Sequence, residues 1–359
     1  MKKVKVELGS NSYEIRIGAD LLARTGLWLR ERGFSGKVAI ITDTTVKSLY
    51  IDSLNKGLTI GGFKAATLEV PAGEEQKSLE TAGRLYHELA SFYAERTTPV
   101  LALGGGVIGD LAGFVAATYM RGVPLIQIPT TLLAQVDSSI GGKTAVDHGQ
   151  LKNAIGVFYQ PKLVIADIDT LKTLPEAELA NGLAEVIKHA AIRNRQLLNF
   201  LDINLEKARA LNTSVLEVIV LENARIKAEV VEKDERESGL RGILNYGHTI
   251  GHALETVTDF QLQHGQAVAI GMVAAAKISS LMGFLEADDA LRLKDVIRRA
   301  GLPTEMPDLN VAEIIQAMQH DKKVKQDKIR FVLLKSIGHA FITDEVSPSL
   351  VEEVLLGRE

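Results

Sequence analysis

The sequence predicts two domains, an α/β domain followed by a mostly helical domain. With 359 residues, the chain is longer than a typical single hydrophobic core. Short apolar runs alternate with helical patterns up to about Pro175, and long amphipathic segments follow. Such an alternation is typical of βαβ units and a mainly parallel sheet. We therefore expect an α/β domain at 1–172 and a mostly helical domain at 173–359.

The first domain is expected to begin with a β-hairpin, formed by 4–8 and 13–17 on either side of a Gly-Ser-Asn-Ser turn. Apolar runs rich in β-branched residues then predict strands at 38–42, 66–70, 100–103, 125–129 and 163–166. Apolar residues at helical spacing predict helices between them, such as 78–92 and 107–118.

The second domain contains longer stretches with apolar residues at helical spacing. They predict helices at 176–200, 214–231, 266–282 and 291–300. A late pair of apolar runs, 329–334 and 340–343, flanks Ile337-Gly338 and predicts a small hairpin.

Composition excludes several classes of protein. The net charge of -4 gives no reason to expect nucleic acid or an anionic membrane as a partner. The absence of cysteine excludes disulfides, thiolate metal sites and a thiol nucleophile, and it is compatible with a reducing cytoplasm. No signal-peptide pattern is present, and no apolar run reaches the roughly 18 residues of a membrane helix. We expect a cytoplasmic enzyme.

A glycine-rich turn follows the predicted strand at 100–103. Gly104, Gly106 and Gly109 satisfy the G-x-G-x-x-G pattern at the point where a strand leads into a helix. Backbone N–H groups without a nearby Cβ can approach an anion there, and the helix dipole favours negative charge. However, the motif does not follow the first strand, and no ribose-binding acid occurs about twenty residues later. A tight turn without a ligand therefore stays an alternative.

Further polar residues lie at the ends of the neighbouring strands, where open α/β sheets bind ligands. Asp43 follows one strand, and the Gly-Glu-Glu-Gln-Lys segment 73–77 follows the next. The segment 141–144 resembles the end of a P-loop, but Asp137 occupies the position that requires glycine, so we reject an NTPase. Lys143, Lys152 and Arg121 remain as candidates for binding a carboxylate or phosphate, with solvated surface cations as the alternative.

Four of the eight histidines, at 189, 248, 252 and 264, form a candidate group in the second domain. His248 and His252 are four residues apart, on one face of a helix. His264 follows, and Glu185 lies with Lys188 and His189 in a predicted helix. Three of the four groups Glu185, His248, His252 and His264 would make a zinc site with an open position. The spacing leaves open which histidine stays off the metal.

A charge run at 232–241 follows the long helix predicted at 214–231. Charge runs are usually solvated. Here Lys227 and Arg241 are candidates for binding an anion, and Glu237 is a candidate for orienting a proton carrier.

Four long blocks together resemble the 3-dehydroquinate synthase family of sugar-phosphate cyclases. They are GGGVIGDLAGFVAATYMRG at 104–122, PTTLLAQVDSSIGGKTAVDHGQLKNAIG at 129–156, GLAEVIKHA at 182–190 and LNYGHTIGHALE at 244–255. The resemblance implies a Rossmann-like α/β N-terminal domain, a mostly helical C-terminal domain and a homodimer. It also implies the conversion of 3-deoxy-D-arabino-heptulosonate 7-phosphate to 3-dehydroquinate and phosphate by transient NAD oxidation, phosphate elimination, reduction and aldol closure.

The resemblance also implies a role for individual residues. A divalent metal, zinc or else cobalt, would be bound by Glu185, His248 and His264, which moves His252 to the acid–base apparatus together with Glu237. NAD would be bound by Asp43, Glu74, Lys77, Gly106, Val107, Ile108, Gly109, Asp110, Thr130, Thr131, Lys152, Thr170, Leu171, Lys172 and Thr173. The substrate would be bound by Arg121, Asp137, Lys143, Asn153, Lys188, Lys227, Arg241 and Asn245, of which Arg121 and Lys143 also take part in catalysis. A further family lysine is expected at Lys322 or Lys323.

Two other enzymes remain as alternatives. Another sugar-phosphate cyclase would share NAD, the metal and most of these residues, but Arg241 and Asn245 suit a substrate with a carboxylate. A metal-dependent polyol dehydrogenase would release NADH in proportion to product, whereas the cyclase reaction leaves no net NADH.

Overall fold

The computed structural model describes residues 1–149, 151–320 and 329–357, which excludes both Lys322 and Lys323. The chain divides into two compact units. The first is Met1–Pro175 with Leu216–Arg236, and the second is Glu176–Val215 with Glu237–Glu359. The division expected at 1–172 and 173–359 differs in two respects: the boundary falls after Pro175, and most of helix α7 (Thr213–Lys233) belongs to the first unit. Amphipathic spacing predicts a helix but not the core against which it packs.

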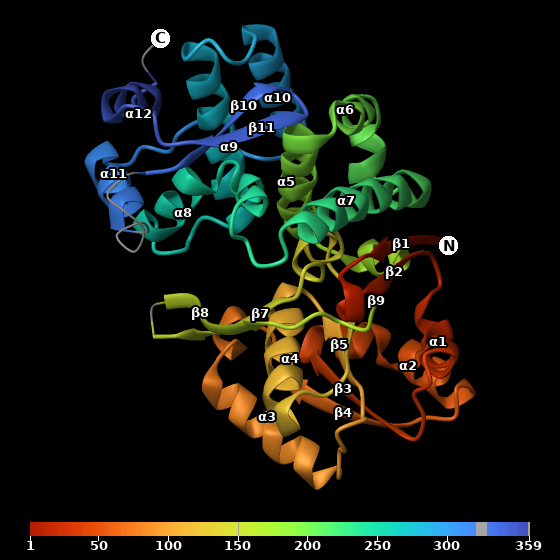
Figure 1. The fold of residues 1–359 in the computed structure, drawn as a ribbon. Helices are drawn as coiled ribbons and strands as arrows, with labels where there is room; N and C mark the ends of the chain where they lie inside the picture. Colours follow the sequence, from red (N-terminus) through yellow and green to blue (C-terminus); the bar gives the residue numbers. More distant parts are fainter. Residues whose placement is uncertain (150, 321–328, 358–359) are drawn as a thin grey trace. The chain divides into compact units, whose positions relative to one another are not determined.

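A seven-stranded sheet forms the centre of the first unit, in the order β1-β2-β9-β6-β5-β3-β4 (Figure 1). Its strands are β1 (Lys2–Val6), β2 (Tyr13–Gly18), β3 (Lys37–Asp43), β4 (Lys64–Val70), β5 (Val100–Gly104), β6 (Leu125–Pro129) and β9 (Leu163–Asp167). Only the edge strand β1 is antiparallel to its neighbour; the other pairs are parallel. The predicted strands and the N-terminal hairpin are confirmed, and so is the Rossmann-like α/β class.

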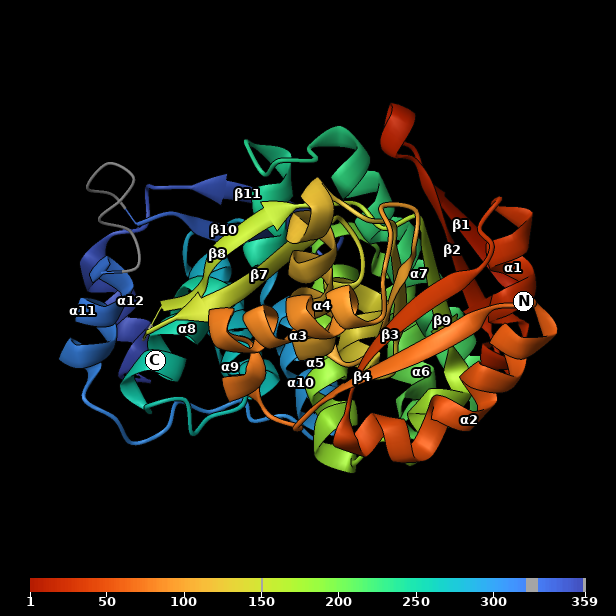
Figure 2. The same cartoon turned by 90° about the horizontal axis from the view of Figure 1, so that it is seen from below.

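Helices cover both faces of this sheet (Figures 1 and 2). Successive residues of β3 point to opposite faces, so Ile41 packs with α3 (Leu79–Ser91) and α4 (Gly106–Thr118), while Ile40 packs with α1 (Thr25–Glu31) and α2 (Thr44–Ile60). Because both faces are buried, the strands are continuous apolar runs and do not alternate with polar residues. Because neighbouring strands run parallel, the loops that follow these strands, and the N-termini of the helices after them, lie at the carboxyl ends of the strands.

One hairpin of the first unit was not predicted. β7 (Lys143–His148) and β8 (Leu151–Phe158) pair antiparallel, with Lys143 opposite Phe158 and Val146 opposite Ile155. The sequence analysis treated this segment as anion-binding residues around glycines and assigned it no strand. β8 is largely exposed, so its residues lack the inward-facing apolar pattern that identifies a strand in a sequence.

The second unit is mostly helical, as predicted. It contains α5 (Glu176–Arg193), α6 (Arg195–Arg209), α8 (His248–Val257), α9 (His264–Leu281), α10 (Ala287–Arg299), α11 (Val311–His320) and α12 (Pro348–Leu355). The late hairpin is confirmed as β10 (Phe331–Ser336) and β11 (His339–Thr343). The single helix predicted at 176–200 is wrong, because Asn194 ends α5 and caps α6 by accepting a hydrogen bond from Leu197 N.

No helix within the described ranges is both long and apolar enough to cross a membrane.

Candidate functional site

Three helices of the second unit bring together one carboxylate and two imidazoles. Glu185 lies in the middle of α5, whereas His248 and His264 are the first residues of α8 and α9. The Nε2 atoms of both histidines are 3.7 Å from Glu185 Oε1, and the three candidate ligand atoms lie within 4.8 Å of one another. Tetrahedral zinc with bonds of about 2.0–2.1 Å separates its ligand atoms by about 3.4 Å. This donor set therefore fits a divalent metal with an open coordination position.

Close helix contacts set the positions of the two histidines. Gly247, just before His248, has φ +79, and a Cβ there would lie 2.7 Å from Val268 O of α9. Gly265, just after His264, donates its N–H to the side-chain oxygen of Asn181 in α5. A Cβ at Gly265 would lie 2.6 Å from Asn181 O. Glycine at both positions thus lets α8 and α5 approach α9 closely enough to form the group.

The second ring nitrogen of each histidine also has a partner. His248 Nδ1 lies 3.1 Å from the carbonyl oxygen of Tyr246. His264 Nδ1 lies 3.1 Å from Glu255 Oε1. Both partners are hydrogen-bond acceptors, so Nδ1 of each ring carries a proton, and Nε2, the nitrogen nearer Glu185, is the one that can bind a metal once it is deprotonated.

The electrostatic environments of the two histidines differ. Burial lowers the pKa of His248 well below its ordinary value, and the ammonium group of Lys188 lowers it further. Burial also lowers the pKa of His264, but hydrogen bonds and charge from Glu185 and Glu255 outweigh it and raise this pKa to about 9. Lys188 itself is buried and forms an ion pair with Glu185 Oε2. Glu185 thus has Lys188 beside its Oε2 atom and His264 beside its Oε1 atom.

His252 lies next to this group but outside it. Its ring is 5.2 Å from the His248 ring and 6.4 Å from the His264 ring. Spacing alone left His252 as a candidate ligand; in the described part of the chain the converging set contains Glu185, His248 and His264. His189, the other histidine noted from the sequence, is fully buried in α5.

A second cluster of polar residues in this unit lies in and just before the short 3-10 helix Leu240–Asn245. Arg241 is almost completely buried, and Asn245 donates from Nδ2 to Glu237 Oε1 over 3.2 Å. Glu237 has a left-handed backbone with φ +57, which turns the chain between α7 and the 3-10 helix. The structure therefore brings together the predicted substrate residue Asn245 and the predicted acid–base residue Glu237.

In the first unit, the glycine-rich turn lies between β5 and α4. Gly105 is the N-cap of α4 and Gly106 its first residue. A Cβ would lie 3.1 Å from Thr131 at Gly105 and 3.2 Å from Ser138 Oγ at Gly106, tighter than most real contacts. The turn is thus a glycine cradle at a helix N-terminus, which is the arrangement that binds a phosphate group.

Lys77 connects this helix to the β7–β8 hairpin. Its buried Nζ donates to Asp110 Oδ2 of α4 over 2.6 Å and also to Asn153 Oδ1 of β8. Asp147 of β7 accepts the N–H of Asn153 over 2.7 Å and supports its left-handed backbone, φ +55. Lys77, predicted to bind NAD, therefore contacts both Asp110, another residue predicted to bind NAD, and Asn153, a residue predicted to bind the substrate. Asp147 was missed because a turn aspartate is unremarkable in a sequence.

Other predicted residues of the first unit differ in how far they are buried and in what they contact. Lys227 of α7 is buried and binds Asp137 Oδ1 over 2.7 Å. Asp43 caps α2 by accepting hydrogen bonds from two backbone N–H groups. Arg121 is exposed and lies in a left-handed turn with φ +63. Other predicted residues with exposed side chains are Glu74, Lys143, Lys152, Lys172 and Thr173. The predicted residues with buried side chains include Thr130, Thr170 and Leu171.

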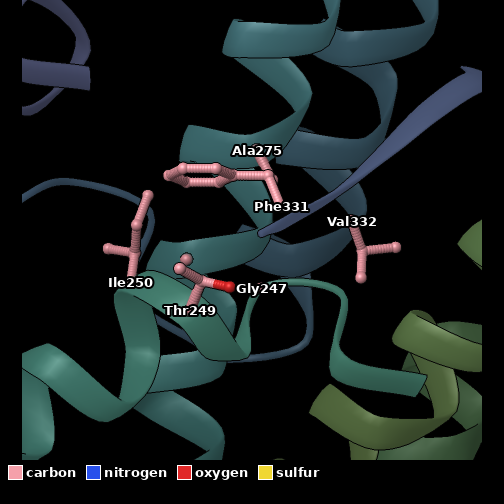
Figure 3. Close-up of a pocket in the computed structure, with 7 residues that line it drawn as sticks. Gly247, Thr249, Ile250, Ala275, Phe331 and Val332 are labelled. Carbon is pink, nitrogen blue, oxygen red and sulfur yellow. The ribbon is translucent and has the colours of Figure 1, made fainter. Parts of the chain in front are cut away.

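A small pocket of the second unit is distinct from these groups (Figure 3). Gly247, Thr249, Ile250, Gly271, Ala275, Phe331 and Val332 line it, from α8, α9 and β10. None of these side chains titrates, and none belongs to the predicted site. The pocket therefore adds no chemical group to the histidine cluster.

The comparisons with known proteins identify the family. Residues 67–181 match the model described as 3-dehydroquinate synthase N-terminal, and residues 182–324 match 3-dehydroquinate synthase C-terminal. A 3-dehydroquinate synthase of Dehalococcoides mccartyi (strain CBDB1) is 50% identical over 355 residues, which cover 99% of this chain and 99% of the relative.

Two solved structures of sugar-phosphate cyclases have a similar fold. A 2-epi-5-epi-valiolone synthase of Streptomyces hygroscopicus subsp. jinggangensis 5008, with NAD+ and Zn2+ bound, is 28% identical with a TM-score of 0.89, covering 99% of this chain and 97% of that one. A 2-deoxy-scyllo-inosose synthase complexed with carbaglucose-6-phosphate, NAD+ and Co2+ is 27% identical with the same TM-score of 0.89, covering 99% of both chains. The fold is that of the sugar-phosphate cyclases. Within them, the chain belongs to the 3-dehydroquinate synthase family.

Proposed function

We propose that this chain converts 3-deoxy-D-arabino-heptulosonate 7-phosphate to 3-dehydroquinate and phosphate, in the shikimate pathway that leads to chorismate and aromatic amino acids. It is a carbon–oxygen lyase that eliminates phosphate and closes a carbocycle. The observation that carries the proposal is the convergence of two imidazole Nε2 atoms on the buried Glu185 carboxylate. Such a site suits chemistry at an alcohol carbon, and the identity to 3-dehydroquinate synthases over the whole chain selects the reaction.

The metal is held by Glu185, His248 and His264. Two imidazoles and one carboxylate suit zinc, and cobalt binds the same donors. The cyclases of similar structure contain Zn2+ or Co2+. When bound, the metal supplies Lewis-acid polarisation of a substrate oxygen. Glu185 contributes the negative charge, and Lys188, beside its second oxygen, holds that carboxylate in place.

NAD is held by the first unit. The backbone N–H groups at the start of α4 bind its pyrophosphate, because glycine at 105 and 106 leaves room for a close approach. When bound, NAD supplies a transient hydride acceptor that is regenerated within the catalytic cycle. The other residues proposed to bind it are Asp43, Glu74, Lys77, Asp110, Thr130, Thr131, Lys152, Thr170, Leu171, Lys172 and Thr173. Lys77 stays protonated, since burial lowers its pKa but the charge of Asp110 more than compensates.

The substrate is bound through its anionic groups. Arg241 and Asn245 suit the carboxylate, since guanidinium and amide groups donate in the plane of its oxygens. The further residues proposed to bind the substrate are Arg121, Asp137, Lys143, Asn153, Lys188 and Lys227. Arg121 and Lys143 stabilise charge that develops on the leaving phosphate. His252 and Glu237 move protons, and the hydrogen bond between Asn245 and Glu237 orients the latter.

One assay tests the proposal. Purified protein is incubated with the heptulosonate phosphate, catalytic NAD and zinc, while phosphate, 3-dehydroquinate and NADH are followed. We expect phosphate and 3-dehydroquinate in equal amounts with no net NADH, and no turnover of a hexose 6-phosphate, which lacks the carboxylate. Accumulation of NADH, or phosphate release that a chelator does not affect, would contradict it.

We further propose a homodimer in the cytoplasm. The dimer rests on the family resemblance, and the compartment on the lack of cysteine in a biosynthetic enzyme. Light scattering of the purified protein measures the first, and fractionation of cells measures the second.

A further inference from the structure

Glu255 contacts the side of the His264 ring that faces away from the metal ligand position. Its Oε1 lies 3.1 Å from His264 Nδ1, whereas Nε2 of the same ring is 3.7 Å from Glu185 Oε1. Glu255 is buried, with 9% of its surface exposed, so its carboxylate is held in a region with little competing water. The two carboxylates therefore contact different nitrogens of one imidazole.

The two histidines of the site are oriented by different chemistry. His248 Nδ1 faces the backbone carbonyl of Tyr246, a neutral acceptor that no side-chain substitution removes. His264 Nδ1 faces a carboxylate, which accepts the Nδ1 proton more strongly and makes Nε2 a better electron donor. The contribution of Glu255 to the site is thus open to a single substitution.

Helix α8 explains how Glu255 reaches this position. His248, His252 and Glu255 follow one another at helical spacings of four and three residues, so their side chains line one face of α8. The rings of His248 and His264 lie 5.3 Å apart. One face of α8 therefore provides a metal ligand, its neighbouring histidine and the partner of the ligand from α9.

We infer that Glu255 is a positioning residue of the metal site: it fixes His264 with the proton on Nδ1, so that Nε2 binds the metal. The inference rests on the proposed function, because it assumes that His264 is a ligand. Glu255 itself is not a member of the converging ligand group, which consists of Glu185, His248 and His264 within the described residues. An ion pair that served only the fold would leave metal affinity unchanged.

The test is the zinc affinity of Glu255→Leu and Glu255→Gln, measured by competition with a chromophoric chelator. Removing the orienting partner of a ligating histidine weakens metal binding by about 10–100-fold. We expect a loss in this range for Glu255→Leu. Glu255→Gln keeps an acceptor but not the charge, and we expect a loss of about threefold to tenfold. Asp259→Asn, which removes the same charge from an exposed residue beyond the end of α8, is the matched control and should bind zinc like the parent protein.

Each outcome separates the inference from the proposed function. A parent protein that binds no zinc would refute the proposed metal site itself. A parent that binds zinc, with variants of equal affinity, would refute the role of Glu255 alone. If Glu255→Leu does not fold by circular dichroism, Glu255→Gln decides, and an affinity equal to that of the parent refutes the inference. The Co2+ absorption spectrum is a second readout, since a rotated His264 changes the ligand field and a purely structural loss does not.

Discussion

Replacing Gly265 with alanine tests how closely helix packing controls the metal site. The new Cβ would lie 2.6 Å from Asn181 O and 2.7 Å from Asn181 Cα, and it would also contact Asn181 Oδ1. Backbone atoms cannot rotate away, so α9 has to shift by about 1 Å to restore van der Waals contact. Overpacking costs about 1–3 kcal/mol and the lost Gly265 N–H bond about 1 kcal/mol more. The better helix propensity of alanine returns about 0.5–1 kcal/mol.

The net expectation is a destabilisation of about 2 kcal/mol, or a fall in Tm of about 4–8 °C, in a thermal scan of the metal-free protein. Because His264 directly precedes Gly265, the shift also moves a proposed ligand, and zinc affinity should fall by about tenfold or more. Gly83→Ala in α3 is the control: no atom lies within 4 Å of its Cβ, so it should stabilise the protein by about 0.5–1 kcal/mol. An unchanged Tm and an unchanged zinc affinity in Gly265→Ala would refute the packing argument.

Three further predictions concern the metal and a buried ion pair. His264→Ala should lose zinc and activity together, whereas His252→Ala should keep zinc, measured by elemental analysis, and lose rate; equal zinc loss in both would mean that the ligand assignment is wrong. A chelator should abolish phosphate release by the parent protein, and added zinc should restore it. Lys77→Met leaves the largely buried Asp110 carboxylate without its ammonium partner, so urea unfolding should report a loss of about 3 kcal/mol. Lys172→Met removes only an exposed ion pair and should cost less than about 1 kcal/mol.

Much of the fold could be predicted because it depends on local patterns. The parallel strands are continuous apolar runs, since helices cover both faces of the sheet, and burial on two faces leaves a clear signal. The β7–β8 hairpin was missed because its second strand is exposed and carries no such pattern. The break at Asn194 was missed because apolar spacing continues through it, and only the cap geometry separates α5 from α6.

Spacing alone predicted the candidate ligands only as a set of four, and the family resemblance then named Glu185, His248 and His264. Spacing placed His248 and His252 on one helical face and suggested Glu185 and His264 as companions, but periodicity within a helix cannot measure distances between helices. Asn181 and Glu255 were not singled out at all. Glu255 continues the spacing of His248 and His252 by one more turn, which was the available signal.

The sequence by itself determined the class of fold, the lack of thiol chemistry and, through four long blocks, the family to which the chain belongs. Residue types and the local spacing of apolar residues decide these properties, and both can be read directly from the sequence. The resemblance named the three ligands, but only the tertiary structure gave their geometry, with Nε2 of His248 and of His264 each 3.7 Å from Glu185 Oε1 and the His252 ring beside them. The physical reason is that α5, α8 and α9 set these distances through glycine contacts and the hydrogen bond from Gly265 to Asn181.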